Sequence, residues 1–202
     1  MIAFELKKKK DFNTSNWSGG STTELYIYPE NSSYKDREFL FRISTAEVSL
    51  EHSCFTSLPG YSRYIMPLKG EMELKHKGHH HIKLNLFEQD YFQGSWDTES
   101  KGKCTDFNLM LKEGLNGGID VIKEEAIRIK LSNEFTGFYL QKSAKVRVFK
   151  SDEEIYSKHL DANDFFILKL QLPNNEYAIE FLSDTNDKAP ISVMAYVNTD
   201  WR

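Results

Sequence analysis

The segment Asn16–Leu25, which reads NWSGGSTTEL, is the most informative stretch of the chain. Its paired glycines allow positive φ angles and a close approach of other backbone, and the hydroxyl residues Ser21–Thr23 that follow favour a strand. Two interpretations are open: a plain turn into a strand at Thr23–Tyr28, or a loop over the mouth of a pocket with Trp17 as an apolar wall. A phosphate-binding loop is excluded, because no Gly-Lys-Ser/Thr follows and no helix pattern lies downstream.

Outward from this segment, apolar residues recur with a period of two along most of the chain, as in Phe165–Leu172. This alternation is typical of half-buried strands, and turn-forming Pro, Gly and Asn residues separate the runs. Helix signals are weak: the alternation in Glu124–Leu131 favours a strand, and Ser151–Glu154 is expected to start at most one helical turn. The pattern predicts an all-β sandwich or barrel.

Three segments together resemble the start of a HutD/Ves-type protein: Asn16–Leu25, Phe41–Ala46 (FRISTA) and Phe55–Arg63 (FTSLPGYSR). That family is cupin-like, and the resemblance implies a double-stranded β-helix (RmlC-like jelly roll) bicupin, an all-β fold with two β-barrels in one chain. The resemblance covers most of residues 10–115, and beyond them only strand layout and length agree. A turn at Leu115–Gly118 marks the expected seam. We therefore predict an N-terminal barrel with a pocket at residues 1–115 and a smaller C-terminal barrel at residues 116–202.

The overall charge argues against polyanionic partners. The net charge is −4 and the sequence pI is about 5.9, a balance that repels phosphate backbones and anionic lipids. The basic run Lys7–Lys10 is interpreted as a solvated strand end. No apolar stretch reaches the roughly 20 residues of a membrane helix and no signal-peptide pattern opens the chain, so we expect a cytoplasmic protein without nucleic-acid or membrane partners. Cys54 and Cys104 are then expected to be reduced and buried.

The predicted strand Phe41–Val48 places Arg42 and Ser44 on one face, beside another small residue. An arginine among small side chains has room to bind a carboxylate through two parallel hydrogen bonds. The alternative is that Arg42 pairs with an internal acid, Asp106 or Glu24, and only orders the barrel.

Three further candidate residues depend on the family resemblance. Arg63 follows a Pro-Gly turn and by itself is an ordinary surface arginine, but an arginine after Pro-Gly recurs in the family's pattern, which implies a pocket position. Asp106 and Asn108 share one face of the predicted strand Lys103–Lys112, and alternation does not decide whether that face points inward or into solvent. The segment Asp106–Met110 resembles the family's Asp-Leu-Asn-hydrophobic-Met segment, which implies the pocket.

Four histidines crowd one hairpin turn: His76, His79, His80 and His81. Imidazole clusters bind transition metals, but a hydrated turn lacks both the closed ligand set of a structural zinc site and the supporting contacts of a catalytic one. The segment Gly60–Leu68, where metal-using cupins carry His-x-His, contains no histidine. We therefore predict no metal and no cofactor, with only adventitious binding at the hairpin.

The candidate ligand-binding site consists of seven residues: Trp17, Thr22, Arg42, Ser44, Arg63, Asp106 and Asn108. In the first hypothesis the two arginines hold the oxygens of a small carboxylate, and the protein is non-catalytic with a regulatory role. HutD members are associated with histidine utilisation, so the resemblance implies a ligand such as urocanate or an N-substituted glutamate.

Two alternatives stay open. The second hypothesis is a metal-independent cupin enzyme of the isomerase or epimerase type, with Asp106, Glu24, Glu47 or Tyr64 as its acid or base. The third is an interaction scaffold or homodimer formed through edge strands and exposed aromatic residues.

Overall fold

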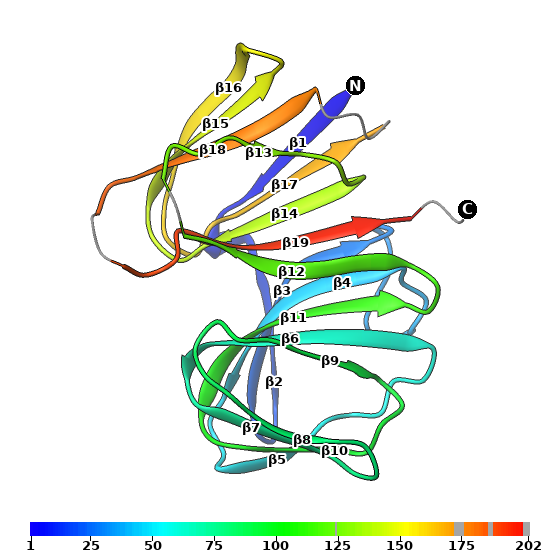
Figure 1. Ribbon diagram of the computed structural model, residues 1–202. Helices are drawn as coiled ribbons and strands as arrows, with labels where there is room; N and C mark the ends of the chain where they lie inside the picture. The colour runs from blue at the N-terminus through cyan, green and yellow to red at the C-terminus, as the bar shows by residue number, and fades with distance from the viewer. Residues whose placement is uncertain (124, 172–175, 186–187, 200–202) are drawn as a thin grey trace. The chain divides into compact units, whose positions relative to one another are not determined.

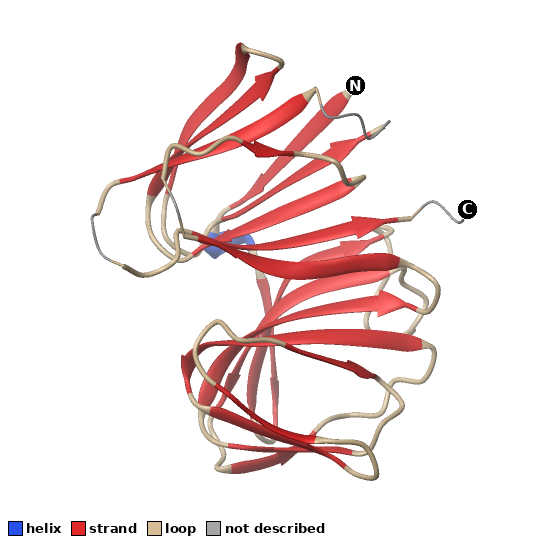
Figure 2. Ribbon diagram, in the orientation of Figure 1, coloured by secondary structure: helices blue, strands red, loops and turns tan. Residues whose placement is uncertain are grey.

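The structure is a computed structural model that describes residues 1–123, 125–171, 176–185 and 188–199. Strands and turns make up these residues, together with one short 3-10 helix at Lys9–Asp11 (Figures 1 and 2). The prediction of an all-β protein is therefore confirmed. Within the same residues, no helix is long and apolar enough to cross a membrane.

The chain divides into two units that differ from the predicted boundaries at the N-terminus. We name Phe12–Asn116 the cavity unit, and Met1–Asp11 together with Gly117–Thr199 the packed unit. Residues 1–11 were predicted in the N-terminal barrel, but β1 (Ile2–Lys7) pairs antiparallel with β17 (Phe165–Leu170). Alternation identifies β1 as a strand but holds no information about which strand it pairs with.

The cavity unit contains two sheets (Figure 1). The six-stranded sheet has the order β2-β3-β4-β11-β6-β9, and the four-stranded sheet has the order β5-β10-β7-β8. The first sheet is built from β2 (Asn13–Trp17), β3 (Gly20–Tyr28), β4 (Phe41–Val48), β11 (Cys104–Lys112), β6 (Tyr61–Gly70) and β9 (Asp90–Gln93). The second is built from β5 (His52–Cys54), β10 (Thr98–Lys101), β7 (Met72–His76) and β8 (His81–Leu84).

The packed unit also contains two sheets. One is five-stranded with the order β1-β17-β14-β19-β12, and the other is four-stranded with the order β13-β18-β15-β16. The strands not yet bounded are β12 (Asn116–Ile122), β13 (Ile129–Lys130), β14 (Phe135–Leu140), β15 (Ala144–Lys150), β16 (Glu153–Leu160), β18 (Tyr177–Ser183) and β19 (Ser192–Asn198).

Two local predictions in the packed unit need correction. The segment expected as a strand at Glu124–Leu131 is paired only at Ile129–Lys130, and residue 124 lies outside the described residues. The helical turn expected at Ser151–Glu154 is a turn that leads directly into β16. A capping order of side chains cannot start a helix where the next residues already pair with β15.

Hydrophobic cores hold each unit together. In the packed unit a cluster of buried residues joins the two sheets, and it includes Phe138, Phe166 and Phe181. In the cavity unit two smaller clusters lie apart, one around Ile65 and Leu74 and the other around Phe39, Leu58 and Tyr61. The polar residues of the candidate site belong to neither of these clusters.

The two cysteines differ in their surroundings. Cys104 is buried, as predicted, and burial raises its pKa to about 12, which makes it an inert thiol. Cys54 is exposed, so the prediction that it is buried is wrong. It ends the short strand β5.

Candidate functional site

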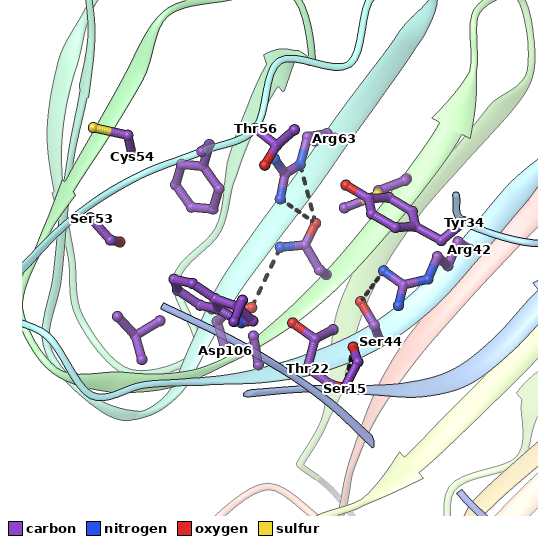
Figure 3. Close-up of a pocket in the computed structure, with 16 residues that line it drawn as sticks. Ser15, Thr22, Tyr34, Arg42, Ser44, Ser53, Cys54, Thr56, Arg63 and Asp106 are labelled. Atoms are coloured by element: carbon purple, nitrogen blue, oxygen red, sulfur yellow. Dashed lines mark hydrogen bonds between the residues drawn. The ribbon is translucent and has the colours of Figure 1, made fainter. Parts of the chain in front are cut away.

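A cavity of about 240 Å³ lies inside the cavity unit (Figure 3). Its wall is formed by residues of the six-stranded sheet and, from the other sheet, by Ser53 and Cys54 of β5. All seven residues of the predicted site line it: Trp17, Thr22, Arg42, Ser44, Arg63, Asp106 and Asn108. The sequence therefore identified one contiguous surface, although the residues come from five separate strands.

Strand register explains why the two arginines share this cavity. In the antiparallel pairing, Met110 of β11 lies opposite Arg42 of β4 on one side and opposite Arg63 of β6 on the other. Residues opposite each other across neighbouring strands project from the same face of a sheet, so this single row aims both guanidinium groups at the same space. The same rule places Asn108 opposite Ser44, one step along the strands.

The inward face of β11 carries Asp106 and Asn108, and both are buried. The opposite face carries Phe107, Leu109 and Leu111, which are buried as well. This explains why alternation alone could not decide the orientation of the strand, since neither face of β11 meets bulk solvent.

Arg42 is both a cavity residue and an ion-pair partner. Its Nε donates to Oε2 of Glu24 at 2.7 Å, and its guanidinium carbon lies 4.5 Å from the ring centre of Tyr34. Its Nη1 also donates a long hydrogen bond of 3.5 Å to Oγ of Ser44. The two interpretations of Arg42 are thus not exclusive, because the Glu24 pair uses Nε and leaves the guanidinium end facing the cavity.

Arg63 is buried without a carboxylate beside it. Its side chain donates from Nε and Nη2 to Oδ1 of Asn108, at 3.4 and 3.2 Å, and lies over the rings of Phe55 and Phe92. Among the described residues it forms no ion pair, and its Nη1 has no hydrogen-bond acceptor. Burial lowers the pKa of Arg63 to about 10, the largest cause being desolvation. The group remains a cation at neutral pH. The charge of Asp106 acts on it from a distance, but no carboxylate among the described residues is hydrogen-bonded to it.

The side chain of Asn108 links Asp106 to Arg63, because it is hydrogen-bonded to both. Asn108 donates from Nδ2 to Oδ1 of Asp106 at 3.4 Å, while its own Oδ1 accepts from Arg63. Burial raises the pKa of Asp106 to about 6, against the opposing effects of the Asn108 hydrogen bond and the Arg63 charge. The carboxyl group thus changes charge within the physiological range.

The Gly-rich segment forms the turn between β2 and β3, and both of its interpretations hold. A Cβ on Gly20 would lie 1.8 Å from the carbonyl oxygen of Glu47, so only glycine fits against β4. A Cβ on Gly19 would lie 2.0 Å from the ring of Trp17, which folds back over the turn and lines the cavity while 39% of the residue stays exposed. The segment is a turn into a strand and also a rim of the cavity.

The sequence reasoning missed the aromatic part of the wall. Phe55 and Tyr34 lie against the two arginines, and Cys54 and Thr56 add a small polar edge (Figure 3). Phe55 begins one of the segments that carry the family resemblance, so its position was available as a signal. Tyr34 sits in the long connection between β3 and β4, where no periodic pattern predicts a direction.

The histidine hairpin also differs from its prediction. It was expected to be a hydrated turn, but the side chain of His76 is fully buried, and its Nε2 lies 2.8 Å from Oδ2 of Asp90. His52 and His159 are exposed. The separation in sequence between the hairpin and Asp90 concealed this contact.

Comparisons with known proteins place the chain in a family. The sequence model of the HutD family matches residues 9–181. A conserved protein of unknown function from Pseudomonas aeruginosa PAO1 is 19% identical, with a TM-score of 0.79 over 98% of this chain and 100% of that chain. HutD from Pseudomonas fluorescens SBW25 is also 19% identical, with a TM-score of 0.72 over 97% of this chain and 98% of that chain.

More distant relatives share the fold alone. A variant of oxalate decarboxylase from Bacillus subtilis is 7% identical, with a TM-score of 0.64 over 98% of this chain and 78% of that chain. Among curated proteins, no sequence match is significant. The chain has a cupin-like, bicupin jelly-roll fold and belongs to the HutD family.

Proposed function

We propose that the protein is a non-catalytic, regulatory binding protein for a small carboxylate, held in the cavity between Arg42 and Arg63. The single observation that carries this proposal is the state of Arg63, a buried cation that faces the cavity with no carboxylate partner among the described residues. Removing a charge from water is unfavourable unless an opposite charge compensates it. A ligand carboxylate would supply that opposite charge and accept hydrogen bonds from Nη1 of Arg63.

The rest of the wall restricts the ligand. The cavity of about 240 Å³ is smaller than the roughly 300–1,000 Å³ of drug-sized sites, so it suits a metabolite rather than a polymer. Phe55, Met110 and Trp17 offer apolar contact. Asp106 accepts hydrogen bonds when ionised and would repel a second carboxylate. The best fit is a molecule with one carboxylate near the arginines and an N–H donor near Asp106.

Urocanate has this combination of groups, which connects the site to histidine utilisation. An N-substituted glutamate has the N–H donor but also a second carboxylate, which Asp106 disfavours. The related HutD from Pseudomonas fluorescens SBW25 was solved in a formate condition, and formate is the smallest carboxylate. For this chain, the pathway link is part of the proposal and rests on the chemistry of the cavity together with family membership.

One observation favours a second candidate function, a metal-independent isomerase or epimerase. Such chemistry needs a carboxyl whose pKa lies near neutrality, and burial brings Asp106 to about 6. However, Asp106 is engaged by Asn108 and no second acid or base is hydrogen-bonded to it among the described residues. Turnover of a bound carboxylate that is abolished in Asp106→Asn, with folding intact, would establish this alternative.

The experiment is a binding screen with a matched pair of arginine variants. Thermal shift and titration calorimetry are run with formate, urocanate, histidine, glutamate and N-substituted glutamates. We expect at least one carboxylate to bind, and Arg63→Met to lose about 10-fold to 150-fold in affinity, since a hydrogen bond to a charged group contributes about 1.5–3 kcal/mol. Arg128→Met, an exposed arginine of the packed unit, is the control and should bind as the wild type does. The proposal fails if no compound raises the melting temperature.

A further inference from the structure

A second cluster of chemically capable side chains lies in the cavity unit, outside the cavity wall. His76 ends β7, His80 follows in the hairpin turn, and Asp90 begins β9. Each of the three offers a nitrogen or carboxylate oxygen, and these atoms all lie within 4.8 Å of one another. The cluster joins the two sheets of the unit, because β7 and β9 belong to different sheets.

The distances in the cluster are close to those of a metal site. His76 Nε2 lies 2.8 Å from Asp90 Oδ2, and His80 Nε2 lies 3.0 and 3.1 Å from the two oxygens of the same carboxylate. Around a tetrahedral zinc ion with bonds of about 2.0–2.1 Å, neighbouring donor atoms lie about 3.3 Å apart. The distances from the carboxylate to the two imidazoles therefore need to lengthen by only about half an ångström or less, and the two Nε2 atoms lie within 4.8 Å of each other.

The cluster also has the supporting contact that a metal-ligating histidine requires. Nδ1 of His76 lies 2.8 Å from Oγ1 of Thr98, and that hydroxyl group is placed to donate to the carbonyl oxygen of Trp96 at 3.3 Å. With its hydrogen directed to Trp96, Thr98 accepts Nδ1–H, and Nε2 of His76 is left with a free electron pair. The rings of Phe92 and Trp96 enclose the imidazole of His76 at 4.6 and 5.6 Å.

We propose that His76, His80 and Asp90 bind one divalent transition-metal ion of the zinc class. Two imidazoles and one carboxylate favour zinc, cobalt, nickel and copper over magnesium and calcium. The side chain of His80 is 38% exposed, so the ion is reached from solvent and keeps water in its remaining position. The neighbouring histidines stay outside the ligand set, because His79 stacks on Trp96 and His81 pairs with Glu73.

This site is separate from the carboxylate cavity and does not depend on the proposed function. It reverses the prediction from sequence that the hairpin binds metals only adventitiously. The two elements that the hairpin itself lacks, a carboxylate ligand and a supporting hydrogen bond, come from Asp90 and Thr98, which are distant in sequence from the hairpin.

The test is metal titration of chelator-treated protein. Zn²⁺ is followed by calorimetry and Co²⁺ by its visible d–d absorption, which reports a low-coordinate site. We expect one ion per chain, no binding of Mg²⁺, and a weakening of about 10-fold to 100-fold in Thr98→Val, which removes only the supporting contact. His80→Asn and Asp90→Asn should each remove a ligand and weaken binding at least as much.

His81→Asn is the matched control, since it removes an imidazole of the same hairpin that points at Glu73. It should retain the affinity of the wild type. Circular dichroism verifies folding, and His80→Asn decides the outcome if Asp90→Asn is unfolded, because His80 lies in a turn and is partly exposed. Absence of both Zn²⁺ heat and Co²⁺ bands in the wild type overturns the proposal. So does an affinity that falls in His81→Asn and persists in His80→Asn.

Discussion

The cavity unit and the packed unit are both built from two β-sheets, but they fill their interiors differently. In the packed unit a large cluster of buried apolar residues joins the two sheets. In the cavity unit, two smaller apolar clusters accompany a cavity lined by buried charged and amide side chains such as Arg63, Asp106 and Asn108. The buried acids of the packed unit, Asp164 and Glu180, form ion pairs with Lys8 and Arg147. Arg63 and Asp106 are joined only through the amide of Asn108 among the described residues, an arrangement unfavourable for folding that indicates a role other than stability.

The largest expected effect is the loss of stability when a buried ring is removed from the packed unit. Phe138→Ala removes a fully buried ring from the apolar cluster and should lower the free energy of unfolding by about 3–5 kcal/mol. Phe55→Ala removes a ring that borders the existing cavity of the other unit and should cost less, because water already reaches the space beside it. Chemical denaturation monitored by circular dichroism measures both. Equal losses would contradict the contrast between the two interiors.

The second effect concerns the buried acid and depends on pH. Because the pKa of Asp106 is about 6 in the folded protein and near 3.9 when unfolded, the folded state binds its proton more tightly. Protonation of Asp106 stabilises the folded state fully at pH values below the pKa of the unfolded state. This stabilisation is lost as the pH rises through the pKa of the folded state, about 6. The loss amounts to about 3 kcal/mol at most.

Asp106→Asn should therefore be more stable than the wild type at pH 7, and the difference should vanish near pH 4. Comparing the two proteins by denaturation across this range cancels the other titrating groups. If the difference in the free energy of unfolding between the two proteins does not change with pH, burial does not raise the pKa of Asp106. A variant that is less stable than the wild type at pH 7 would contradict the sign.

Much of the fold and most of the site followed from the sequence, for physical reasons that individual residues make clear. Alternation identified Phe41–Val48 as a strand with Arg42 and Ser44 on one face, since a strand's side chains alternate whatever it pairs with. The partner of β1 could not be predicted, because pairing depends on tertiary packing. Side chains from connections without periodicity, such as Tyr34, were missed for the same reason.

The histidine hairpin also shows what local sequence cannot predict. Four histidines in one turn were visible, but Asp90 and Thr98, which determine what His76 does, lie on strands that only the fold brings together. Residue type and local spacing indicate what a side chain offers. Burial and partners, which decide whether it is used, come from the fold.

The third effect separates the two arginines of the cavity. Arg42 is already paired with Glu24, whereas within the described part of the chain Arg63 is hydrogen-bonded to the amide of Asn108 and to no carboxylate. Arg63→Met should therefore weaken carboxylate binding by about 1.5–3 kcal/mol, and Arg42→Met by less. Titration calorimetry with the tightest carboxylate of the screen measures both. A larger loss in Arg42→Met would show that the Glu24 pair opens when the ligand binds.

The smallest effect concerns Glu24 itself. Glu24→Gln keeps an oxygen to accept the hydrogen bond from Arg42 but removes a negative charge from a partly exposed side chain. We expect carboxylate affinity to rise by about fivefold at most, the equivalent of about 1 kcal/mol. A loss of affinity instead would identify Glu24 as an acceptor of the ligand's own donor groups.

The most direct measurement is a crystal structure of the protein with the tightest-binding carboxylate of the screen. We predict that the ligand lies in the cavity with a carboxylate oxygen accepting from Nη1 of Arg63, and with the Arg63–Asn108–Asp106 network intact. A carboxylate bound elsewhere, while this cavity holds only water, would contradict the account.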